Sequence, residues 1–337
     1  MNTYILNKEK TRALIGGNIG KPVLTLDLKP SDDVLVLEIS SYQMDLCPTF
    51  RPDIAVLLNI TPDHLDRHGT MDNYVAAKER MLEGTGVAVI GIDDAHGLAI
   101  YDRLVKSAAR KIIPVSVKKE ITGGVYIKDG HLIDHTGENA VTVGLVSDIA
   151  TLQGAHNHQN LCAAYVVCKE AGMFGEDIIL AARAYPGLPH RQQIIRVING
   201  TSYINDSKAT NYEATEKALS CYNNIYLIAG GQPKEGGLKG IELQTDRIRH
   251  VFLVGEAAED FSAYLDKIGI PNTVSHTLDV AVLEAHRTAQ SRRGAPGGAG
   301  TVLLSPACAS WDQFRNFEHR GETFANLVNA LSDEVSA

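Results

Sequence analysis

The chain has 337 residues, with 44% hydrophobic and 21% charged residues and a formal net charge of −8. This length allows two domains with their own cores, and the acidic balance argues against nucleic acid as the main partner. No apolar run reaches the length of a membrane span, and the N-terminus lacks a signal-peptide core. The five cysteines form no C-x-x-C pair, which indicates a reduced, cytoplasmic protein rather than a zinc ribbon or disulfide framework.

In the first half of the chain, apolar β-type runs alternate with helical patterns. Continuous apolar strands separated by helices predict a parallel sheet covered on both faces. Short alternating strands at 123–145, with a hairpin turn at Asp129-Gly130, then precede two helices. In chain order, the other strands and helices are predicted at 34–39, 54–60, 73–82, 87–92, 95–108, 112–117, 157–171 and 176–184.

The second half restarts with a hairpin around Asn199-Gly200 and then alternates again between strands and helices. The fold class is therefore α/β, with two doubly wound domains, 1–186 and 187–337, joined at the proline-stiffened stretch 185–191. The remaining elements of the second domain are predicted at 211–221, 225–229, 250–254, 257–267, 279–290, 301–305 and 320–331.

Lys78 falls on the apolar side of the helix predicted at 73–82. Helical spacing groups it with Tyr74 and Met81, and with Val75 and Leu82. Its ammonium can reach water along its stem. Alternatively, as a neutral amine beside a metal site, it can take up carbon dioxide and become an anionic carbamate.

Glu38 and His64 lie at or just beyond the carboxyl ends of predicted parallel strands. Ligand sites of open α/β sheets lie at this edge, and the two side chains could share a magnesium ion whose shell phosphate oxygens complete. The structural alternatives are a helix cap and a hydrogen-bonded loop histidine. Zinc binding by His64 and His68 is disfavoured by the loop context around Gly69.

The segment N-D-S-K-A-T-N, 205–211, packs charged and hydroxyl side chains into a turn between strand and helix. Thr210 and Glu213 fit a capping box, which leaves Asp206 and Lys208 at a predicted helix N-terminus. Lys208 suits a nucleotide phosphate and Asp206 suits a ribose hydroxyl.

Two further segments carry more polar side chains than capping explains. The helix start G-A-H-N-H-Q-N, 154–160, holds two asparagines, although a cap needs only one. The loop at 304–321 contains Ser305, Ser310, Asp312 and Arg315 among aromatic residues that are usually core, and it suggests a pocket for a small polar ligand. No G-x-x-x-x-G-K-[ST] or G-x-G-x-x-G motif accompanies these segments.

Together these segments resemble the Mur ligase family, from about Gly16 to the C-terminus. The loop S-P-A-C-A-S-W-D-Q-F is particular to the D-glutamate-adding branch of that family. The matching motifs are, in order, E-I-S-S-Y-Q, N-I-T-P-D-H-L-D-R-H, Y-x-x-A-K-x-R, H-N-x-x-N, G-L-P-H-R, N-D-S-K-A-T-N and S-P-A-C-A-S-W-D-Q-F.

The resemblance implies an ATP- and magnesium-dependent amide ligase of peptidoglycan synthesis. It would join D-glutamate to UDP-N-acetylmuramoyl-L-alanine through an acyl phosphate, with a central ATP-binding domain and a C-terminal amino-acid-binding domain. Carried over, the metal ligands are Glu38, His64 and a carbamylated Lys78, the last two also being catalytic. The implied ATP contacts are Asn157, Asn160, Arg191 and Asp206. The implied substrate contacts are Asn18, Ser40, Lys208, Thr210, Lys234, Ser305 and Phe317.

The chain also departs from the family pattern. The UDP-binding domain and the phosphate loop that members carry ahead of this region do not occur in it, and residues 1–12 match nothing in the family. We therefore expect impaired activity for this chain alone, together with exposed apolar surface near 14–28 and self-association. The alternatives are a non-catalytic binding module that keeps the D-glutamate site, and a ligase resembling folylpolyglutamate synthase.

Overall fold

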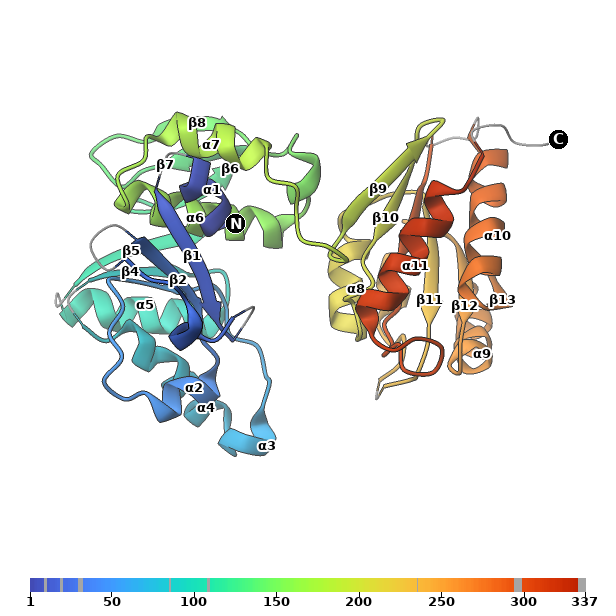
Figure 1. The fold of residues 1–337 in the computed structure, drawn as a ribbon, viewed down its shortest axis with the longest axis horizontal. Coiled ribbons are helices and arrows are strands. Elements are labelled where there is room, and N and C mark those ends of the chain that lie inside the picture. Colours follow the sequence, from blue (N-terminus) through green and yellow to red (C-terminus); the bar gives the residue numbers. More distant parts are fainter. Residues whose placement is uncertain are drawn as a thin grey trace. The chain divides into compact units, whose positions relative to one another are not determined.

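A computed structural model describes residues 1–8, 11–18, 21–29, 33–84, 86–107, 110–234, 236–293 and 299–332. The chain divides into two compact units, Met1–Tyr185 and Pro186–Ala337 (Figure 1), one residue from the boundary expected from the sequence. None of the helices in these described ranges is long and apolar enough to cross a membrane.

The main sheet of unit 1 has six strands in the order β3-β4-β5-β6-β7-β8. The first four strands run parallel, and β6, β7 and β8 form an antiparallel meander. The meander begins in the segment where the sequence pattern changes to short alternating strands. The strands are β3 (Ile54–Leu57), β4 (Val87–Gly91), β5 (Lys111–Ser116), β6 (Val125–Lys128), β7 (His131–Asp134) and β8 (Val141–Leu145).

Helices cover both faces of this sheet, as the continuous apolar strands predict. Val89 of β4 packs in the cluster formed with α6, whereas its neighbours Ala88 and Ile90 pack in the cluster formed with α4 and α5. Successive side chains of a strand point to opposite faces, so β4 is buried on both sides. Figure 1 shows α5 and α6 on opposite sides of the strands. The helices are α4 (Met71–Glu79), α5 (Ala95–Ser107), α6 (Ala155–Glu170) and α7 (Gly175–Arg183).

The predicted strand 34–39 does not join this sheet. It forms β2 (Asp33–Glu38), which pairs in parallel with β1 (Arg12–Gly17) in a separate two-stranded sheet. Sequence analysis missed β1 because the six-residue stretch R-A-L-I-G-G has no clear alternation and ends in glycines. Glu38 and His64 therefore follow strands of different sheets, which corrects the single sheet expected for 34–117.

The N-terminal segment is folded although it matched no family motif. It forms α1 (Asn2–Lys8), whose Ile5 and Leu6 are fully buried in the main core of unit 1. The expected exposed apolar surface near 14–28 is confirmed, because Leu24 is 99% exposed and Ile15 and Leu28 are also exposed. Self-association through this surface stays a prediction.

Two short helices and a helical extension complete unit 1. The missed α2 (Ser41–Leu46) follows β2, and α3 (Leu65–His68) lies between β3 and α4. The helix predicted at 73–82 begins two residues earlier and ends as a 3-10 turn, η2 (Arg80–Leu82).

Unit 2 contains one six-stranded sheet in the order β13-β12-β11-β14-β10-β9. All neighbours are parallel except β9 and β10, which form the hairpin predicted from Asn199-Gly200. The missed strand β13 lies at the sheet edge, and its polar sequence N-T-V-S-H lacks an apolar run. The strands are β9 (Gln193–Ile198), β10 (Thr201–Asn205), β11 (Ile225–Gly230), β12 (Ile248–Val254), β13 (Asn272–His276) and β14 (Thr301–Leu304).

Both faces of this sheet are covered, as in a doubly wound fold. The side chains of α8 and α9 pack in one cluster with Leu227 of β11, and those of α10 and α11 pack in another with Ile228. The adjacent strands β10, β14 and β11 run parallel, so the loops after them lie at one edge of the sheet. The helices are α8 (Tyr212–Leu219), α9 (Ala258–Ile268), α10 (Leu278–Ser291) and α11 (Phe317–Asn329).

Candidate functional site

Asp206 and Ser305 meet where β10 and β14 end in unit 2. The Ser305 hydroxyl donates to Asp206 Oδ2 at 2.8 Å, and the backbone N–H of Gln192 donates to Oδ1 at 3.1 Å. Asp206 is 4% exposed and Ser305 is fully buried. Burial raises the pKa of Asp206 to about 7, although both hydrogen bonds and the charge of Arg191 oppose this shift.

Lys208 and Phe317 lie beside this buried pair. Lys208 Nζ is 5.5 Å from the centre of the Phe317 ring, and its side chain is exposed. An ammonium over an aromatic face is attracted by the ring quadrupole. The contact joins the loop after β10 to the first residue of α11, and the two residues are 109 positions apart in the sequence. A cation and an apolar ring side by side suit a ligand with a carboxylate and an aliphatic stem.

The helix after this loop starts later than the sequence pattern predicts. Asn211, not Thr210, is the N-cap of α8, and its side chain accepts a hydrogen bond from Ala214 N at 3.0 Å. The predicted capping box of Thr210 and Glu213 is wrong, because the chain reaches helical geometry only at Tyr212. Asp206 and Lys208 consequently lie in the loop rather than at the helix N-terminus.

Lys234 lies in the loop after β11 and is exposed. This loop pairs with the loop after β14, because Gln232 and Ala309 exchange backbone hydrogen bonds of 2.9 and 3.1 Å. The structure therefore places Lys208, Lys234, Ser305 and Phe317 on loops and a helix start at one edge of the sheet. Thr210 follows in the same loop as Lys208 and is half-buried.

Sequence analysis missed three residues that hold this edge together: His190, Ser207 and Arg320. The carbonyl oxygen of His190 accepts a hydrogen bond from Lys208 N at 3.0 Å, and the His190 ring lies 6.3 Å from the Phe317 ring. Ser207 and Arg320 are buried and bonded to each other. No sequence signal identified them, since a serine inside a polar motif and an arginine inside an amphipathic helix both fit ordinary surface positions.

In unit 1, Glu38 and Asn18 lie at the ends of paired strands. Asn18 Nδ2 donates to Glu38 Oε1 at 3.3 Å, and Asn18 N donates to the Glu38 carbonyl at 2.7 Å. Both side chains are exposed. Ser40 lies two residues beyond Glu38 and is the N-cap of α2, with its hydroxyl accepting from Gln43 N. Its hydroxyl therefore has a structural role that the sequence analysis did not consider.

His64 is held among aromatic rings in a left-handed backbone conformation, with φ of 54°. The ring lies 5.0 Å from Tyr42 and 6.4 Å from Tyr74, and Nδ1 is 3.4 Å from the Tyr42 hydroxyl. Non-glycine residues rarely adopt this conformation, and such strain gathers at functional sites. His190 and Ala307, with φ of 59° and 57°, share it and flank the unit 2 site.

Lys78 belongs to this same aromatic group. Its Nζ lies 5.0 Å from the centre of the Tyr74 ring, and the residue is half-buried. Tyr74 itself is 5% exposed and part of the core beneath α4. The side chain of Lys78 thus has an aromatic face as its partner.

The donor chemistry of this region fits magnesium. Glu38 offers carboxylate oxygens and His64 a ring nitrogen, and both are exposed. Within the described part of the chain, no cluster of three or more His, Cys, Asp or Glu could hold a metal ion. Magnesium commonly binds through one or two protein ligands and completes its shell with water and phosphate oxygens, so a sparse set suits it better than zinc or calcium.

The proposed nucleotide residues divide between the two units. Asn157 and Asn160 are half-buried in the first turns of α6, where Asn157 Nδ2 donates to the Gln153 carbonyl at 2.8 Å. That contact occupies one of its two amide hydrogens. Arg191 is exposed in unit 2, and its charge acts on the buried Asp206.

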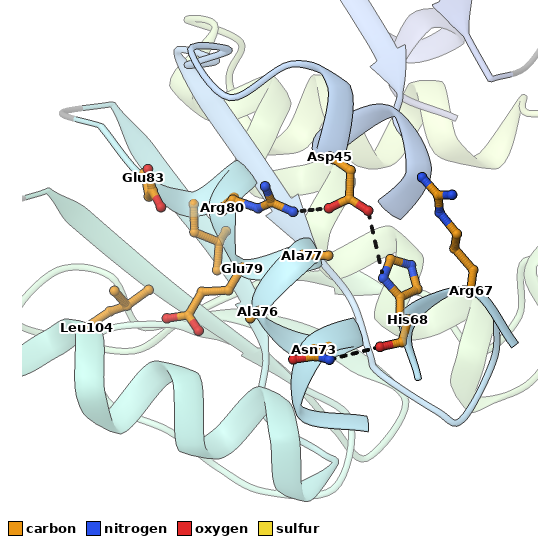
Figure 2. Close-up of a pocket in the computed structure, with 11 residues that line it drawn as sticks. Asp45, Arg67, His68, Asn73, Ala76, Ala77, Glu79, Arg80, Glu83 and Leu104 are labelled. Carbon is orange, nitrogen blue, oxygen red and sulfur yellow. Dashed lines mark hydrogen bonds and ion pairs between the residues drawn. The ribbon is translucent and has the colours of Figure 1, made fainter. Parts of the chain in front are cut away.

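A cavity of about 700 Å³ in unit 1 has none of the predicted site residues in its lining (Figure 2). Arg80 forms an ion pair with Asp45 across it, and Asn73 Nδ2 donates to the His68 carbonyl at 2.9 Å. Its glutamates pair with arginines outside the lining, Glu79 with Arg103 and Glu83 with Arg51. The lining residues are Asp45, Arg67, His68, Asn73, Ala76, Ala77, Glu79, Arg80, Leu82, Glu83 and Leu104.

Known proteins resemble the chain in sequence over nearly all its length. A UDP-N-acetylmuramoylalanine–D-glutamate ligase of Rhodospirillum rubrum is 48% identical over 337 residues, covering 99% of this chain and 70% of the relative. The protein of that name from Paramagnetospirillum magneticum is 47% identical, covering 99% of this chain and 72% of the relative. The Mur ligase middle domain matches residues 3–168, so the expectation that residues 1–12 match nothing in the family is wrong.

Solved structures support the fold. A UDP-N-acetylmuramate–alanine ligase from Thermotoga maritima superposes with a TM-score of 0.64 at 14% identity, covering 98% of this chain and 72% of that one. A Mycobacterium tuberculosis folylpolyglutamate synthase gives a TM-score of 0.56 at 16% identity, covering 88% and 69%. At these identities the likeness concerns the fold, whereas the sequence matches decide the family: the chain belongs to the Mur ligase family, among the UDP-N-acetylmuramoylalanine–D-glutamate ligases.

Proposed function

We propose that the chain acts as the D-glutamate-adding ligase of peptidoglycan synthesis, with ATP, D-glutamate and UDP-N-acetylmuramoyl-L-alanine as substrates. The observation that carries the proposal is the contact of Lys208 with Phe317 beside the buried Asp206–Ser305 pair. Asp206, Lys208 and Ser305 belong to motifs by which the chain resembles its D-glutamate-adding relatives, and Phe317 follows the last of these motifs by three residues.

Unit 2 supplies the amino-acid site in this proposal. Lys208 and Lys234 would pair with the carboxylates of D-glutamate, because each is an exposed cation on loops at the same sheet edge. Thr210 would offer a hydroxyl group, and Phe317 would pack against the aliphatic stem. Ser305 is fully buried and its hydroxyl already contacts Asp206 Oδ2 and Thr215 Oγ1, so it would support the site through Asp206.

The proposed reaction has two steps. A carboxylate oxygen of the muramoyl substrate attacks the γ-phosphorus of ATP, forming an acyl phosphate and releasing ADP. The amine of D-glutamate then attacks the acyl carbon, loses a proton and expels inorganic phosphate. Positioning and charge neutralisation provide most of the acceleration in such chemistry.

Unit 1 supplies the phosphate side of this chemistry. Glu38 and His64 would hold magnesium, which when bound neutralises phosphate charge. Asn18 and Ser40 would lie near the muramoyl substrate. Asn157 and Asn160 of unit 1 would contact the nucleotide, and the same role is proposed for Arg191 and Asp206 of unit 2.

Lys78 would act as a carbamate in this site. The ammonium first loses a proton; the neutral amine then attacks carbon dioxide, an N–C bond forms and a second proton is released, so an anion replaces a cation. Lys78 Nζ lies over the face of the Tyr74 ring, which attracts cations and not anions, so the modified side chain has to leave that ring. Protein incubated with ¹³C-bicarbonate should show a carbamate NMR signal that is absent from Lys78→Ala.

One assay separates the proposal from its alternatives. Purified protein is given ATP, magnesium and UDP-N-acetylmuramoyl-L-alanine, and amide product is measured with D-glutamate, L-glutamate or a folate acceptor. Product with D-glutamate alone supports the proposal, and product with folate supports the folylpolyglutamate alternative. D-glutamate binding without product supports the binding module, and neither binding nor product contradicts a D-glutamate site.

The rate of phosphate release in that assay is a further expectation. A polypeptide of these 337 residues should release phosphate slowly, because its sequence has no phosphate-loop motif to cradle the β- and γ-phosphates. Phosphate release at an ordinary ligase rate of roughly 1–1000 per second would contradict this expectation.

A further inference from the structure

Arg320 is a buried cation whose hydrogen bonds go to one hydroxyl and to backbone carbonyl groups. It lies on the first turn of α11 and is 1% exposed. Nε donates to Ser207 Oγ at 3.0 Å and Nη2 to the Ser207 carbonyl at 2.9 Å. Nη2 also donates to the Cys308 carbonyl at 3.1 Å, and Nη1 to the Ala309 carbonyl at 3.3 Å. Burying a charge is costly, so such an arrangement needs a reason beyond packing.

These bonds join the segments that carry the proposed amino-acid site. Ser207 directly precedes Lys208 in the loop after β10, and its hydroxyl donates to the Phe317 carbonyl at 2.8 Å. Cys308 and Ala309 lie in the loop after β14, which also carries Ser305. Arg320 and Phe317 are one turn apart on α11, so the guanidinium links the two segments that carry Lys208 and Phe317.

The connection extends to the loop after β11. Ala309, which accepts from Arg320, also exchanges backbone hydrogen bonds with Gln232. Gln232 lies two residues before Lys234. One guanidinium thus contacts two of the three loops directly and reaches the third through a single backbone pair.

A planar guanidinium suits this task better than an ammonium. Its fixed fork directs N–H groups in several directions within one plane, and it remains charged when buried. Burial lowers the pKa of Arg320 to about 10, so the group stays protonated at neutral pH. The charges of Cys308 and Asp312 oppose the shift. Lysine could not reach Ser207, Cys308 and Ala309 with the same geometry.

We propose that Arg320 is a positioning residue for the amino-acid substrate: with Ser207 it fixes the loops after β10 and β14 against α11, so that Lys208 and Phe317 form one binding surface. The inference rests on the proposed D-glutamate site but names residues that do not themselves contact the substrate. Arg320 acts through Ser207 and the loop carbonyls, and Ser207 acts through the Phe317 carbonyl.

The chain offers a matched control for this role. Arg196 of β9 donates to the carbonyls of Val328, Asn329 and Leu331 at the other end of α11. Arg196→Lys and Arg320→Lys therefore both disturb arginine–carbonyl bonds that hold α11, at opposite ends of the helix. Ser207→Ala is a milder variant, since it removes a hydroxyl and leaves the guanidinium in place.

The test measures D-glutamate affinity by calorimetry, with the muramoyl substrate, magnesium and a non-hydrolysable ATP analogue present at saturation. Arg320→Lys should weaken D-glutamate binding by roughly tenfold to a hundredfold, with a smaller loss for Ser207→Ala, because misplacing binding groups by about 1 Å has effects of this size. Nucleotide affinity should change much less than D-glutamate affinity, since Arg320 bonds directly to none of the proposed nucleotide residues. Arg196→Lys should leave D-glutamate affinity unchanged while lowering the melting temperature.

A second measurement needs no ligand. Trp311 is the only tryptophan of the sequence, lies in the loop after β14 and is 71% exposed. Its fluorescence anisotropy should fall in Arg320→Lys and not in Arg196→Lys, because only the former releases this loop. If the unmodified protein fails to bind D-glutamate, the proposed function fails, and the anisotropy still decides whether Arg320 orders the loop. Equal effects of the two lysine variants on affinity and anisotropy would overturn the positioning role.

Discussion

The two candidate regions differ in how far they are organised before any ligand binds. In unit 2, Asp206, Ser305 and Arg320 are buried and joined by hydrogen bonds to loops at one sheet edge. In unit 1, Glu38 and His64 are exposed and follow strands of different sheets. A preorganised site loses little freedom on binding, whereas exposed side chains must be ordered by the ligand itself.

The difference follows the chemistry proposed for each unit. D-glutamate is a small flexible ligand with two carboxylates, so its site depends on fixed cations and an apolar wall. Magnesium brings most of its own shell as water and phosphate oxygens, so the protein needs to provide few ligands. Unit 1 should therefore be sensitive to the loss of single charged groups, and unit 2 to the loss of its supporting bonds.

The largest expected effect is in unit 1. Lys78→Ala should lower the rate of acyl phosphate formation by about a hundredfold or more, since charged groups at phosphoryl sites often contribute that much. The measurement is ADP release at saturating substrates, relative to the unmodified chain. Lys106→Ala changes an exposed lysine on α5 and should leave the rate unaltered. An equal rate of ADP release in the two variants would show that Lys78 takes no part in acyl phosphate formation.

In unit 2, Lys208→Ala should weaken D-glutamate binding by roughly tenfold to a hundredfold, because charge-assisted hydrogen bonds contribute about 1.5–3 kcal/mol. Calorimetry with D-glutamate measures the change. Lys217→Ala removes an exposed lysine from α8 in the same unit and serves as the control. If Lys208→Ala binds D-glutamate as the control does, the Lys208–Phe317 contact is structural only.

Asp206 predicts a pH dependence of stability. Its pKa is raised from 3.8 to about 7 by burial, so the folded protein binds this proton more tightly than the unfolded chain. The stabilisation is complete below the unfolded value and is lost as pH rises through about 7. The difference amounts to a few kcal/mol as an order of magnitude. Denaturant unfolding followed from pH 4, just above the unfolded value, to pH 8, above the folded value, should show this loss in the unmodified protein.

Asp206→Asn supplies the comparison, because asparagine does not titrate. Its stability should fall less over the same pH range, and the two proteins should differ most at the upper end of that range, above the folded pKa of Asp206. Parallel stability curves for the two proteins would indicate that Asp206 remains ionised in the fold, with Ser305 and Gln192 compensating for its burial.

The sequence was sufficient for most of the fold and for the location of the unit 2 site. Continuous apolar runs such as 225–229 and 301–305 identify central strands wherever they occur, and Asn199-Gly200 identifies a hairpin. The loops after those strands then fall at one edge by topology alone. The edge strand β13 and the short β1 were missed, because an edge strand requires no apolar run and a six-residue strand contains little pattern.

The failures within the sites have a different cause. Arg320 is an arginine on an amphipathic helix. Its burial depends on carbonyl groups of loops, and one of their residues, Ser207, lies more than a hundred positions away in the sequence. Local patterns do not contain such information. Likewise, the separate sheet of β1 and β2 arises from strand pairing, which the apolar run at 34–39 does not specify.

The smallest expected effect concerns the start of α8. Asn211→Ala should lower the stability of unit 2 by about 1 kcal/mol, because the side chain accepts from Ala214 N and replacing such a cap by alanine typically has this effect. Thermal unfolding should then occur about 2–4 °C lower. Thr210→Ala serves as the control and should shift the transition less, since Thr210 precedes the cap. A larger shift for Thr210→Ala would restore the capping box that its sequence suggests and would place Lys208 closer to the helix N-terminus.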